Sequence, residues 1–230
     1  GGNGPVDVLK GTYTVVLLDV ETTGFCKTND RVTQLAAKVM GSQDPNHSFS
    51  AFVDPVRYIP YRIQKLTGIT PEMLVANNAK PFRKTWGRFS SWLAAVAPKG
   101  TGDGIVVVAH NAGFDHRFMV AELARAGFDR FAMGKLGVVA FVDSIRVLKD
   151  KRMWRQGFAD VDVPLRPPRF KLGLVFKHLY GHKMPGAHNA LGDVEGLERI
   201  LSAPGIAERW RLVASTDPTC QIAVSRSLEE

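Results

Sequence analysis

Two carboxylates stand at the end of an apolar run in the segment VVLLDVETTGF, residues 15–25. Side chains two residues apart in a β-strand point to the same side, so Asp19 and Glu21 can aim at one point. Carboxylates held this close repel each other unless a positive group lies between them, and no Lys or Arg occupies a neighbouring position. Hard divalent cations such as Mg²⁺ and Mn²⁺ prefer oxygen ligands. The pair therefore predicts a metal site, with a solvated strand end or a turn cap as the alternative.

Buried strands and amphipathic helices must position these acids. Continuous apolar or β-branched runs predict central strands, and the candidates are residues 12–20, 31–40, 48–53, 105–111 and 137–144. Apolar residues at helical spacing, with Pro at helix starts and Gly at helix ends, predict helices over residues 71–79, 81–97, 114–127, 172–181 and 190–201. Strands first, followed by strands alternating with helices, indicate an α/β fold with a mixed five-stranded sheet flanked by helices. Residues 98–104 and about 150–170 are expected to form loops.

The composition favours a polyanion as partner. Lys and Arg outnumber Asp and Glu by 30 to 22, which gives a net charge of +8. This excess suits nucleic acid first and an anionic membrane surface second, and the alternative is a basic protein with no such partner. The two cysteines, Cys26 and Cys220, lie far apart, which argues against a disulfide framework and for an intracellular, reducing location in the cytoplasm, the nucleus or an organelle. No apolar run reaches the roughly 18 residues that span a membrane, and no signal-peptide pattern is present.

Four segments together resemble the DEDDh (DnaQ-like) 3′→5′ exonuclease family. DVETTGF, residues 19–25, is similar to the first family motif, and HNAGFDHRFM, residues 110–119, is similar to the second. HNALGD, residues 188–193, is similar to the third motif, and LTGIT, residues 66–70, to the loop between the first two. The segments come in the family's order, and the resemblance covers about residues 12–202. DVETTGF and HNAGFDHRFM are most similar to ribonuclease T and its proofreading relatives, whereas VDSIRVLK, HLYG and HNALGDV are similar to TREX-type enzymes.

The resemblance implies a ribonuclease H-like exonuclease fold and five catalytic side chains, Asp19, Glu21, Asp115, His188 and Asp193. The four carboxylates would hold two Mg²⁺ or Mn²⁺ ions, which clamp the attacking and leaving oxygens of a phosphoryl displacement. His188 would remove a proton from the attacking water, because the pKa of histidine suits a general base near neutral pH. The implied reaction is hydrolysis at unpaired 3′ ends of single-stranded DNA or RNA, with release of nucleoside 5′-monophosphates.

The spacing between His188 and Asp193 constrains where each residue lies. Five residues on a helix rotate by about 500°, so the two side chains would face apart if both positions were helical. His188 is therefore expected on the loop before the helix, and Asp193 in the first turns of the helix. Pro185 and Gly186 support this expectation, because both residue types interrupt a preceding helix.

Family likeness also assigns residues to substrate contact, and these are Thr22, Thr23, Gly24, Phe25, Leu66, Ile69, Asn111 and Phe114. The backbone of residues 22–24 would lie against the terminal sugar, and the two phenylalanines would stack on bases. Leu66 and Ile69 would wedge under the last base, and Asn111 would hold the Asp115 loop or contact the substrate. An ordinary turn is the alternative for residues 22–24, and packing in the core is the alternative for the apolar side chains.

Two further residues and one basic stretch remain open. His110 is expected to be a structural histidine that forms hydrogen bonds. Asp143 is either the N-cap of a following helix or a fifth acid near the metals. Nine basic residues lie between residues 146 and 177 with Trp154, Phe158 and Phe170 among them, a pattern that suits a single nucleic-acid strand. The alternative is a solvated face whose aromatic side chains turn toward the core.

The predicted organisation is a flexible N-terminus over residues 1–11, an exonuclease domain over residues 12–202 and a C-terminal helix or tail over residues 203–230. The alternatives to a free-standing nuclease are a non-catalytic nucleic-acid-binding module, a proofreading or processing subunit that is active only in a complex, and an enzyme that acts on short oligonucleotides. Two further partner hypotheses are a homodimer, which the family often forms, and a protein that recognises the Pro/Arg loop 164–169. No membrane partner is expected.

Overall fold

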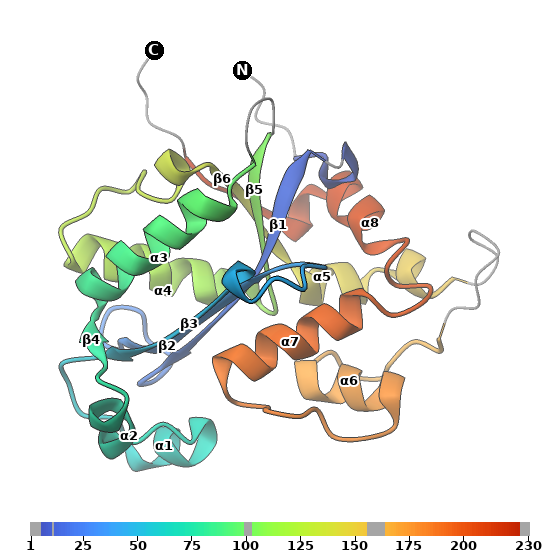
Figure 1. Cartoon of the computed structure of the whole chain (residues 1–230). Coiled ribbons are helices and arrows are strands. Elements are labelled where there is room, and N and C mark those ends of the chain that lie inside the picture. Colours follow the sequence, from blue (N-terminus) through green and yellow to red (C-terminus); the bar gives the residue numbers. More distant parts are fainter. Residues whose placement is uncertain (1–5, 11, 99–102, 156–163, 226–230) are drawn as a thin grey trace.

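One mixed sheet of seven strands organises the chain, in the order β4-β3-β2-β1-β5-β6-β7 (Figure 1). The computed structural model describes residues 6–10, 12–98, 103–155 and 164–225. The strands are β1 (Tyr13–Thr22), β2 (Val32–Val39), β3 (Ser48–Asp54), β4 (Lys80–Pro81), β5 (Gly104–Ala109), β6 (Val138–Asp143) and β7 (Gln221–Ala223). β1, β2 and β3 form an antiparallel meander, and β1 also pairs with β5 in parallel, as β5 does with β6. β1 is therefore the central strand, as its continuous apolar run predicts.

Helices cover both faces of the sheet. They are α1 (Tyr61–Thr67), α2 (Pro71–Ala76), α3 (Phe82–Val96), α4 (Ala112–Arg125), α5 (Ser144–Lys149), α6 (Leu172–Tyr180), α7 (Ala190–Leu201) and α8 (Trp210–Thr216). Side chains alternate along β1, so Val15 and Leu17 join the core beneath α5, α6, α7 and α8. Val16 and Leu18 join the core beneath α3 and α4 on the opposite face. Asp19 and Glu21 therefore lie on a strand that is packed between two hydrophobic cores.

The sheet has two strands more than the five predicted. β4 contains two residues and runs parallel to β3, and β7 contains three residues and runs antiparallel to β6. Neither segment is long enough to show a period of two in the sequence. Residues 203–225 therefore include α8 and a strand of the sheet.

The predicted helices are present with small shifts at their ends, and α1 is an addition. Pro71 occupies the first position of α2, where its missing N–H costs no hydrogen bond, and Thr70 caps that helix. α1 occupies residues 61–67, so Leu66 and Thr67 of the predicted loop are helical. Gly68 ends this helix in the left-handed conformation (φ 72°), which glycine adopts without strain.

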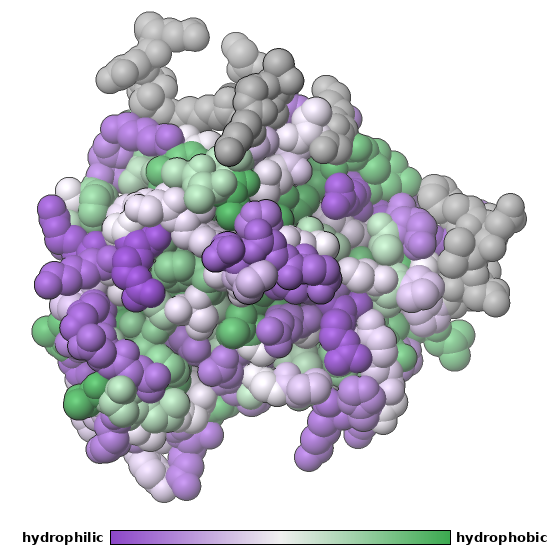
Figure 2. All heavy atoms as spheres, in the orientation of Figure 1, coloured by the Kyte–Doolittle hydropathy of each residue, from purple (hydrophilic) through white to green (hydrophobic). Residues whose placement is uncertain are grey.

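Some predictions fall outside the described residues. These are residues 1–5 and 11 of the predicted N-terminal tail, 99–102 and 156–163 of the predicted loops, and 226–230 at the C-terminus. Within the described ranges, no helix combines the length and the apolar character that crossing a membrane requires. Figure 2 shows that hydrophilic and hydrophobic side chains are interspersed on the face of the molecule that is seen in Figure 1.

Candidate active site

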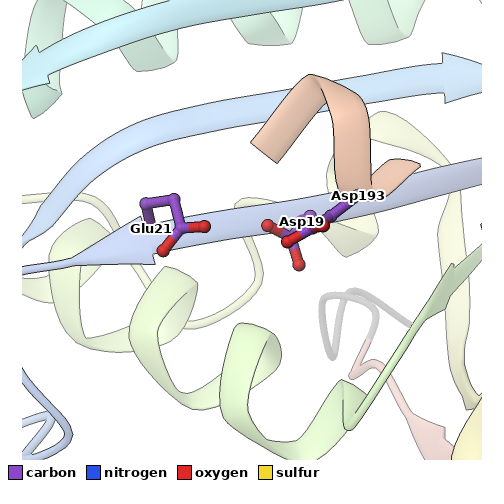
Figure 3. A group of neighbouring side chains, drawn as sticks. All are labelled: Asp19, Glu21 and Asp193. Atoms are coloured by element: carbon purple, nitrogen blue, oxygen red, sulfur yellow. The ribbon is translucent and has the colours of Figure 1, made fainter. Parts of the chain in front are cut away.

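Three carboxylates converge on one point between the centre of the sheet and α7. Asp19 and Glu21 extend from β1, and Asp193 reaches toward Asp19 from α7 (Figure 3). One oxygen of each carboxylate lies within 4.8 Å of one oxygen of the other two. The prediction that Asp19 and Glu21 aim at one point agrees with this geometry. Residues 174 positions apart in the sequence thus form one group of oxygen ligands.

The start of α7 places Asp193 and His188. Asn189 is the N-cap of this helix, and its side chain accepts a hydrogen bond from the backbone N–H of Leu191. Asp193 lies in the first turn of the helix. His188 lies on the preceding turn, with a φ of 66°, and its backbone N–H donates to Asp193 Oδ1 at 3.3 Å. The two residues therefore occupy the loop and the helix as their spacing predicts.

Glycine permits the loop before α7 to approach the helix closely. Gly186 has a φ of 67° and packs directly against Gly192 in the first turns of α7. A Cβ atom at Gly192 would collide with the backbone carbonyl of Gly186. This contact of two backbones fixes the turn that carries His188 against the helix that carries Asp193.

Asp115 approaches the three carboxylates from the other side of β1. It lies in the first turn of α4 and is buried, with 2 % of its surface exposed. Asp115 Oδ1 accepts a hydrogen bond of 3.1 Å from the backbone N–H of Val20. The paired part of β5 ends opposite Leu17, so this N–H lies beyond the ladder between β1 and β5. The side chain of Asp115 takes the place of a strand partner there.

Burial raises the pKa values of all four carboxylates, and for Asp19, Glu21 and Asp115 the charges of neighbouring acids add to this shift. Burial and the charges of neighbouring acids raise the pKa of Glu21 to about 8 and also raise the pKa of Asp19. Burial raises the pKa of Asp115 to about 8 and that of Asp193 to about 6. Among the described residues, none of these acids takes part in an ion pair with Lys, Arg or His. Close oxygen donors without a cationic side chain have the chemistry that a hard divalent cation requires.

Among the residues predicted to contact substrate, two phenylalanines form an accessible pair. Phe25 is 67 % exposed, and its ring centroid lies 6.4 Å from that of Phe114. The ring of Phe114 also packs against Phe118 at 4.7 Å, so it lies at the edge of the core. The pair stands at the end of β1 and the start of α4, beside the carboxylates that these elements carry.

Residues 22–24 form a tight, mostly buried turn. Thr22 Oγ1 donates to the carbonyl of Gly24 at 2.5 Å, and Thr23 Oγ1 donates to Asp30 at 3.1 Å. A Cβ atom at Gly24 would collide with the carboxylate of Asp30, so packing requires glycine here. The threonine side chains thus have partners within the turn.

The two apolar residues predicted to wedge under a base differ in how much of their side chains is exposed. Leu66 is 45 % exposed on α1, whereas Ile69 is 1 % exposed and packs in a small cluster with Ile59, Ile63 and Leu74. The prediction of substrate contact does not fit the side chain of Ile69, because neighbouring apolar side chains enclose it.

A hydrogen bond between Asn111 and Asp143 connects the ends of β5 and β6. Asn111 has a φ of 78°, and its backbone N–H donates to Asp143 Oδ1 at 3.1 Å. The same oxygen accepts from the backbone N–H of Ile145, so Asp143 is the N-cap of α5, the first of its two predicted roles.

His110 is a partly buried structural histidine that forms hydrogen bonds, as expected. Its Nε2 lies 2.7 Å from the carbonyl of Phe170, which can only accept, so Nε2 carries the proton. Its Nδ1 then accepts from the hydroxyl of Ser144 at 2.8 Å. Burial lowers the pKa of His110 to about 4.

The aromatic side chains of the basic stretch 146–177 turn toward the core where the structure describes them. Trp154 is 8 % exposed and donates to the carbonyl of Leu148, and Phe170 packs against the core beneath α7. The hypothesis that these rings stack on bases is therefore wrong for Trp154, because its ring is enclosed by protein. Phe158 lies outside the described residues.

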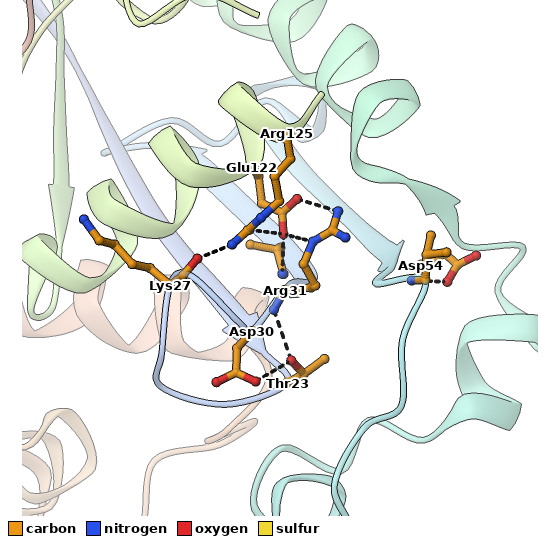
Figure 4. A network of polar contacts seen from close by, with 9 residues as sticks. Thr23, Lys27, Asp30, Arg31, Asp54, Glu122 and Arg125 are labelled. Atoms are coloured by element: carbon orange, nitrogen blue, oxygen red, sulfur yellow. Dashed lines mark hydrogen bonds and ion pairs between the residues drawn. The ribbon is translucent and has the colours of Figure 1, made fainter. Parts of the chain in front are cut away.

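Two buried polar residues were missing from the sequence prediction. Gln34 on β2 is 2 % exposed, and its Oε1 accepts a hydrogen bond from the backbone N–H of Ala190. Glu122 on α4 is 1 % exposed and binds Arg31 through two hydrogen bonds of 2.7 and 2.9 Å (Figure 4). Glu122 also accepts from Arg125, which in turn donates to the carbonyl of Lys27. The signal that could have found Gln34 is a lone amide within a strand predicted to be buried.

Comparison with known proteins places these features in one family. The RNase_T family model, described as "Exonuclease", matches residues 16–200. The chain is 31 % identical over 186 residues to a PolC-type DNA polymerase III of Clostridium perfringens, covering 81 % of this chain and 11 % of that protein. It is 37 % identical over 114 residues to the 3′-5′ exonuclease DinG of Bacillus subtilis, covering 49 % of this chain and 11 % of that protein. The chain thus spans about a tenth of the length of these two relatives.

A solved structure shares the fold at low sequence identity. Exonuclease I of E. coli in complex with a dT13 oligonucleotide superposes with a TM-score of 0.62 at 20 % identity, covering 90 % of this chain and 42 % of that chain. The DEDD exonucleases use divalent metal ions, and the three converging carboxylates have the donor set that such an ion needs. The predicted resemblance to this group is confirmed, and the chain belongs to the RNase_T exonuclease family.

Proposed function

We propose that this chain is a metal-dependent 3′→5′ exonuclease that removes nucleotides from unpaired 3′ ends and releases nucleoside 5′-monophosphates. The observation that carries the proposal is the convergence of Asp19, Glu21 and Asp193 beside Asp115, with His188 on the adjoining turn. These are the five residue types at the positions that hydrolysis of a phosphodiester requires in this family.

The carboxylates are the proposed ligands of two Mg²⁺ or Mn²⁺ ions, with Asp19, Glu21 and Asp193 at one ion and Asp19 and Asp115 at the second. When bound, such ions neutralise phosphate charge and lower the pKa of water. His188 accepts a proton from the attacking water, whose oxygen forms a bond to phosphorus while the bond from phosphorus to the 3′ oxygen breaks. The leaving 3′ oxygen takes a proton from solvent water, and His188 later returns its proton to solvent. The products are a nucleoside 5′-monophosphate and a strand with a new 3′ hydroxyl.

Single-stranded DNA is the proposed substrate, with RNA as the alternative. The relatives include PolC-type DNA polymerases, and exonuclease I binds an oligonucleotide of deoxythymidines. The exposed ring of Phe25 and the half-buried ring of Phe114 offer a surface for unpaired bases, which stack on aromatic rings without regard to sequence. The turn over residues 22–24 is the proposed seat of the terminal sugar.

The test is digestion of 5′-labelled single-stranded DNA and RNA of one sequence with Mg²⁺, with Mn²⁺ and with EDTA. We expect ladders that shorten from the 3′ end only when metal is present. Asp193→Asn should remove activity, and His188→Gln should lower the rate by about 10²–10⁴, the usual contribution of a general base. Glu195→Gln, an exposed position on the same helix, is the matched control and should leave the rate within twofold.

Intact strands with both metals, together with tight binding, would favour the non-catalytic binding module. Activity that arises only after addition of a larger protein would favour the subunit hypothesis. A homodimer and a partner at the Pro/Arg loop 164–169 stay predictions, and light scattering of the purified chain tests the first. In that loop Leu165 is 79 % exposed, while Arg166 is held against the ring of Phe170 at 4.8 Å.

A further inference from the structure

Two adjoining hollows lie along the exposed side of α4. The first, with a volume of about 410 Å³, lies between α4 and the β1–β2 loop, and Lys27, Arg117 and Arg125 are among its lining residues. The second, with a volume of about 630 Å³, lies between α4, the start of α5 and β7, and its lining includes Arg146. His116 and Arg117 line both hollows, so the two adjoin each other, and together we call them the α4 groove.

The α4 groove is positively charged. Its cationic side chains are Lys27, Arg117, Arg125 and Arg146. Arg125 is paired with Glu122, and Arg146 lies 3.7 Å from Asp143. Within the part of the chain that the structure describes, Lys27 and Arg117 take part in no ion pair. Burial lowers the pKa of His116, and the nearby charge of Lys27 lowers it further.

The groove is lined by the elements that carry the aromatic pair, the β1–β2 loop and α4. Lys27 follows Phe25 by two residues in the same loop, and Arg117 follows Phe114 by one turn of α4. The rings of Phe25 and Phe114 form the pair described above. Asp143 at the end of β6 lines the second hollow, and its charge acts on Asp115 of the candidate active site. The cations of the groove therefore follow the aromatic pair along the same loop and helix.

From this geometry we infer that the α4 groove binds the phosphates of the substrate strand on the 5′ side of the nucleotides held at the carboxylates. The inference rests on the proposed function, because a strand whose 3′ end lies at the carboxylates can continue only in the 5′ direction. Lys and Arg contact phosphate oxygens without reading base sequence. The groove therefore adds affinity for long strands and leaves sequence preference unchanged. The aromatic pair on the same loop and helix favours a nucleic acid over an acidic peptide as the occupant.

The experiment measures binding rather than hydrolysis, in EDTA, by fluorescence anisotropy. The probes are labelled single strands of about 15 and about three nucleotides, because single-strand sites span roughly 4–16 nucleotides. The groove variant carries Lys27→Gln, Arg117→Gln and Arg146→Gln. The control variant carries Lys84→Gln, Arg88→Gln and Arg211→Gln, which remove the same charge from positions that line neither hollow. Circular dichroism and thermal unfolding check that both variants are folded.

We expect the groove variant to bind the long strand at least about tenfold more weakly than the control variant. The slope of log K against log salt should fall by about 2, which is three lost phosphate contacts at about 0.7 each. The short strand should bind both variants alike. Equal binding of the long strand by both variants would overturn the inference, and so would equal losses for both strand lengths. Displacement of the long strand by polyglutamate at equal concentration would assign the groove to an acidic peptide instead. Because the experiment measures binding and not hydrolysis, its results test the groove even if the protein has no exonuclease activity.

Discussion

Gln34 on β2 and Ala190 at the start of α7 are joined by a hydrogen bond of 3.1 Å from the backbone N–H of Ala190 to the side-chain oxygen of Gln34. Gln34 lies opposite Glu21 in the register of β1 and β2. The first N–H groups of a helix have no partner within it, so Gln34 satisfies one that would otherwise be buried and unpaired. The sheet thereby fixes the start of the helix that brings Asp193 to the other carboxylates. At the far end of α7, Glu198 binds Lys38 and the N–H of Gly41, so β2 holds this helix at two points.

Replacing Gln34 should therefore weaken both the fold and the metal site. Gln34→Leu leaves the N–H of Ala190 without an acceptor, and we expect the free energy of unfolding to fall by about 1–3 kcal/mol. We also expect weaker Mn²⁺ binding by calorimetry, because Asp193 loses its fixed position. Gln34→Glu keeps an acceptor oxygen and should retain the helix start. Unchanged unfolding and Mn²⁺ affinity in Gln34→Leu would show that the bond positions nothing.

Replacing a helical glycine by alanine should harm the protein at one position and stabilise it at another. At Gly192 a Cβ atom would collide with the carbonyl of Gly186, so Gly192→Ala should displace the His188 turn and lower the hydrolysis rate by at least about tenfold, a cost of about 1.4 kcal/mol. At Gly87 on α3 no atom lies near the added Cβ, so Gly87→Ala should raise the free energy of unfolding by about 0.5–1 kcal/mol. Urea unfolding and digestion rates check both variants. Normal activity in Gly192→Ala would contradict the proposed role of the close backbone contact.

Without metal, the protein should lose stability as the pH rises through about 8. Glu21 and Asp115 have pKa values of about 8 in the folded chain, well above those of unfolded carboxyls, so the folded state alone holds these protons near neutral pH. Stability then falls with rising pH by about 1.4 kcal/mol per pH unit for each such proton. His110, with its pKa lowered to about 4, is neutral in the folded chain, and it opposes this fall only below about pH 7.5, where the unfolded histidine still binds a proton.

Urea unfolding in EDTA between about pH 6.5 and 8.5 measures this fall. Saturating Mn²⁺ should abolish it, because bound cations keep the carboxylates ionised. Asp193→Asn removes a charge that raises the pKa of both Glu21 and Asp115, so it should reduce the fall in EDTA. A slope in EDTA that is identical in the wild-type protein and in Asp193→Asn would contradict the repulsion between these acids.

The Glu122 network should hold the β1–β2 loop against α4 (Figure 4). Glu122→Ala leaves the partly buried Arg31 without its carboxylate, and we expect a loss of about 3 kcal/mol or more in the free energy of unfolding. Trypsin should then cleave after Lys27 or Arg31 faster than in the wild-type protein. Arg125→Ala is the control, since it removes one longer contact of 3.3 Å and leaves the two bonds between Arg31 and Glu122 in place. Equal effects of the two substitutions on unfolding would argue against Arg31–Glu122 as the main clamp.

Local patterns were enough to predict the central sheet and the acids that it positions. The run before Asp19 identifies a strand buried on both faces, because such strands are apolar without alternation. The placement of His188 and Asp193 follows from helix geometry alone. By contrast, Gln34 and Ala190 are 156 residues apart, and Arg31 and Glu122 are 91 apart. Such pairings depend on the packed fold, and no period or spacing in the sequence reports them.

The two short strands and α1 were missed for a related reason. β4 and β7 have two and three residues and exist because a neighbouring strand supplies their hydrogen bonds. α1 has one fully buried side chain, Ile63, so it lacks the apolar stripe that reveals a longer helix. Sequence pattern also could not show that Trp154 is buried, because an aromatic residue among basic ones has the same pattern whether its ring faces solvent or the core.

Asp115 has two roles. Its side chain accepts a hydrogen bond from the backbone N–H of Val20 on β1, and it is one of the acids of the candidate site. Asparagine offers the same oxygen to that N–H and carries no charge. Asp115→Asn should therefore preserve the fold while removing one acid beside the carboxylate cluster, whereas Asp115→Ala confounds the two effects. Asp115→Asn should therefore give a folded, inactive protein that can be crystallised in complex with an uncut strand.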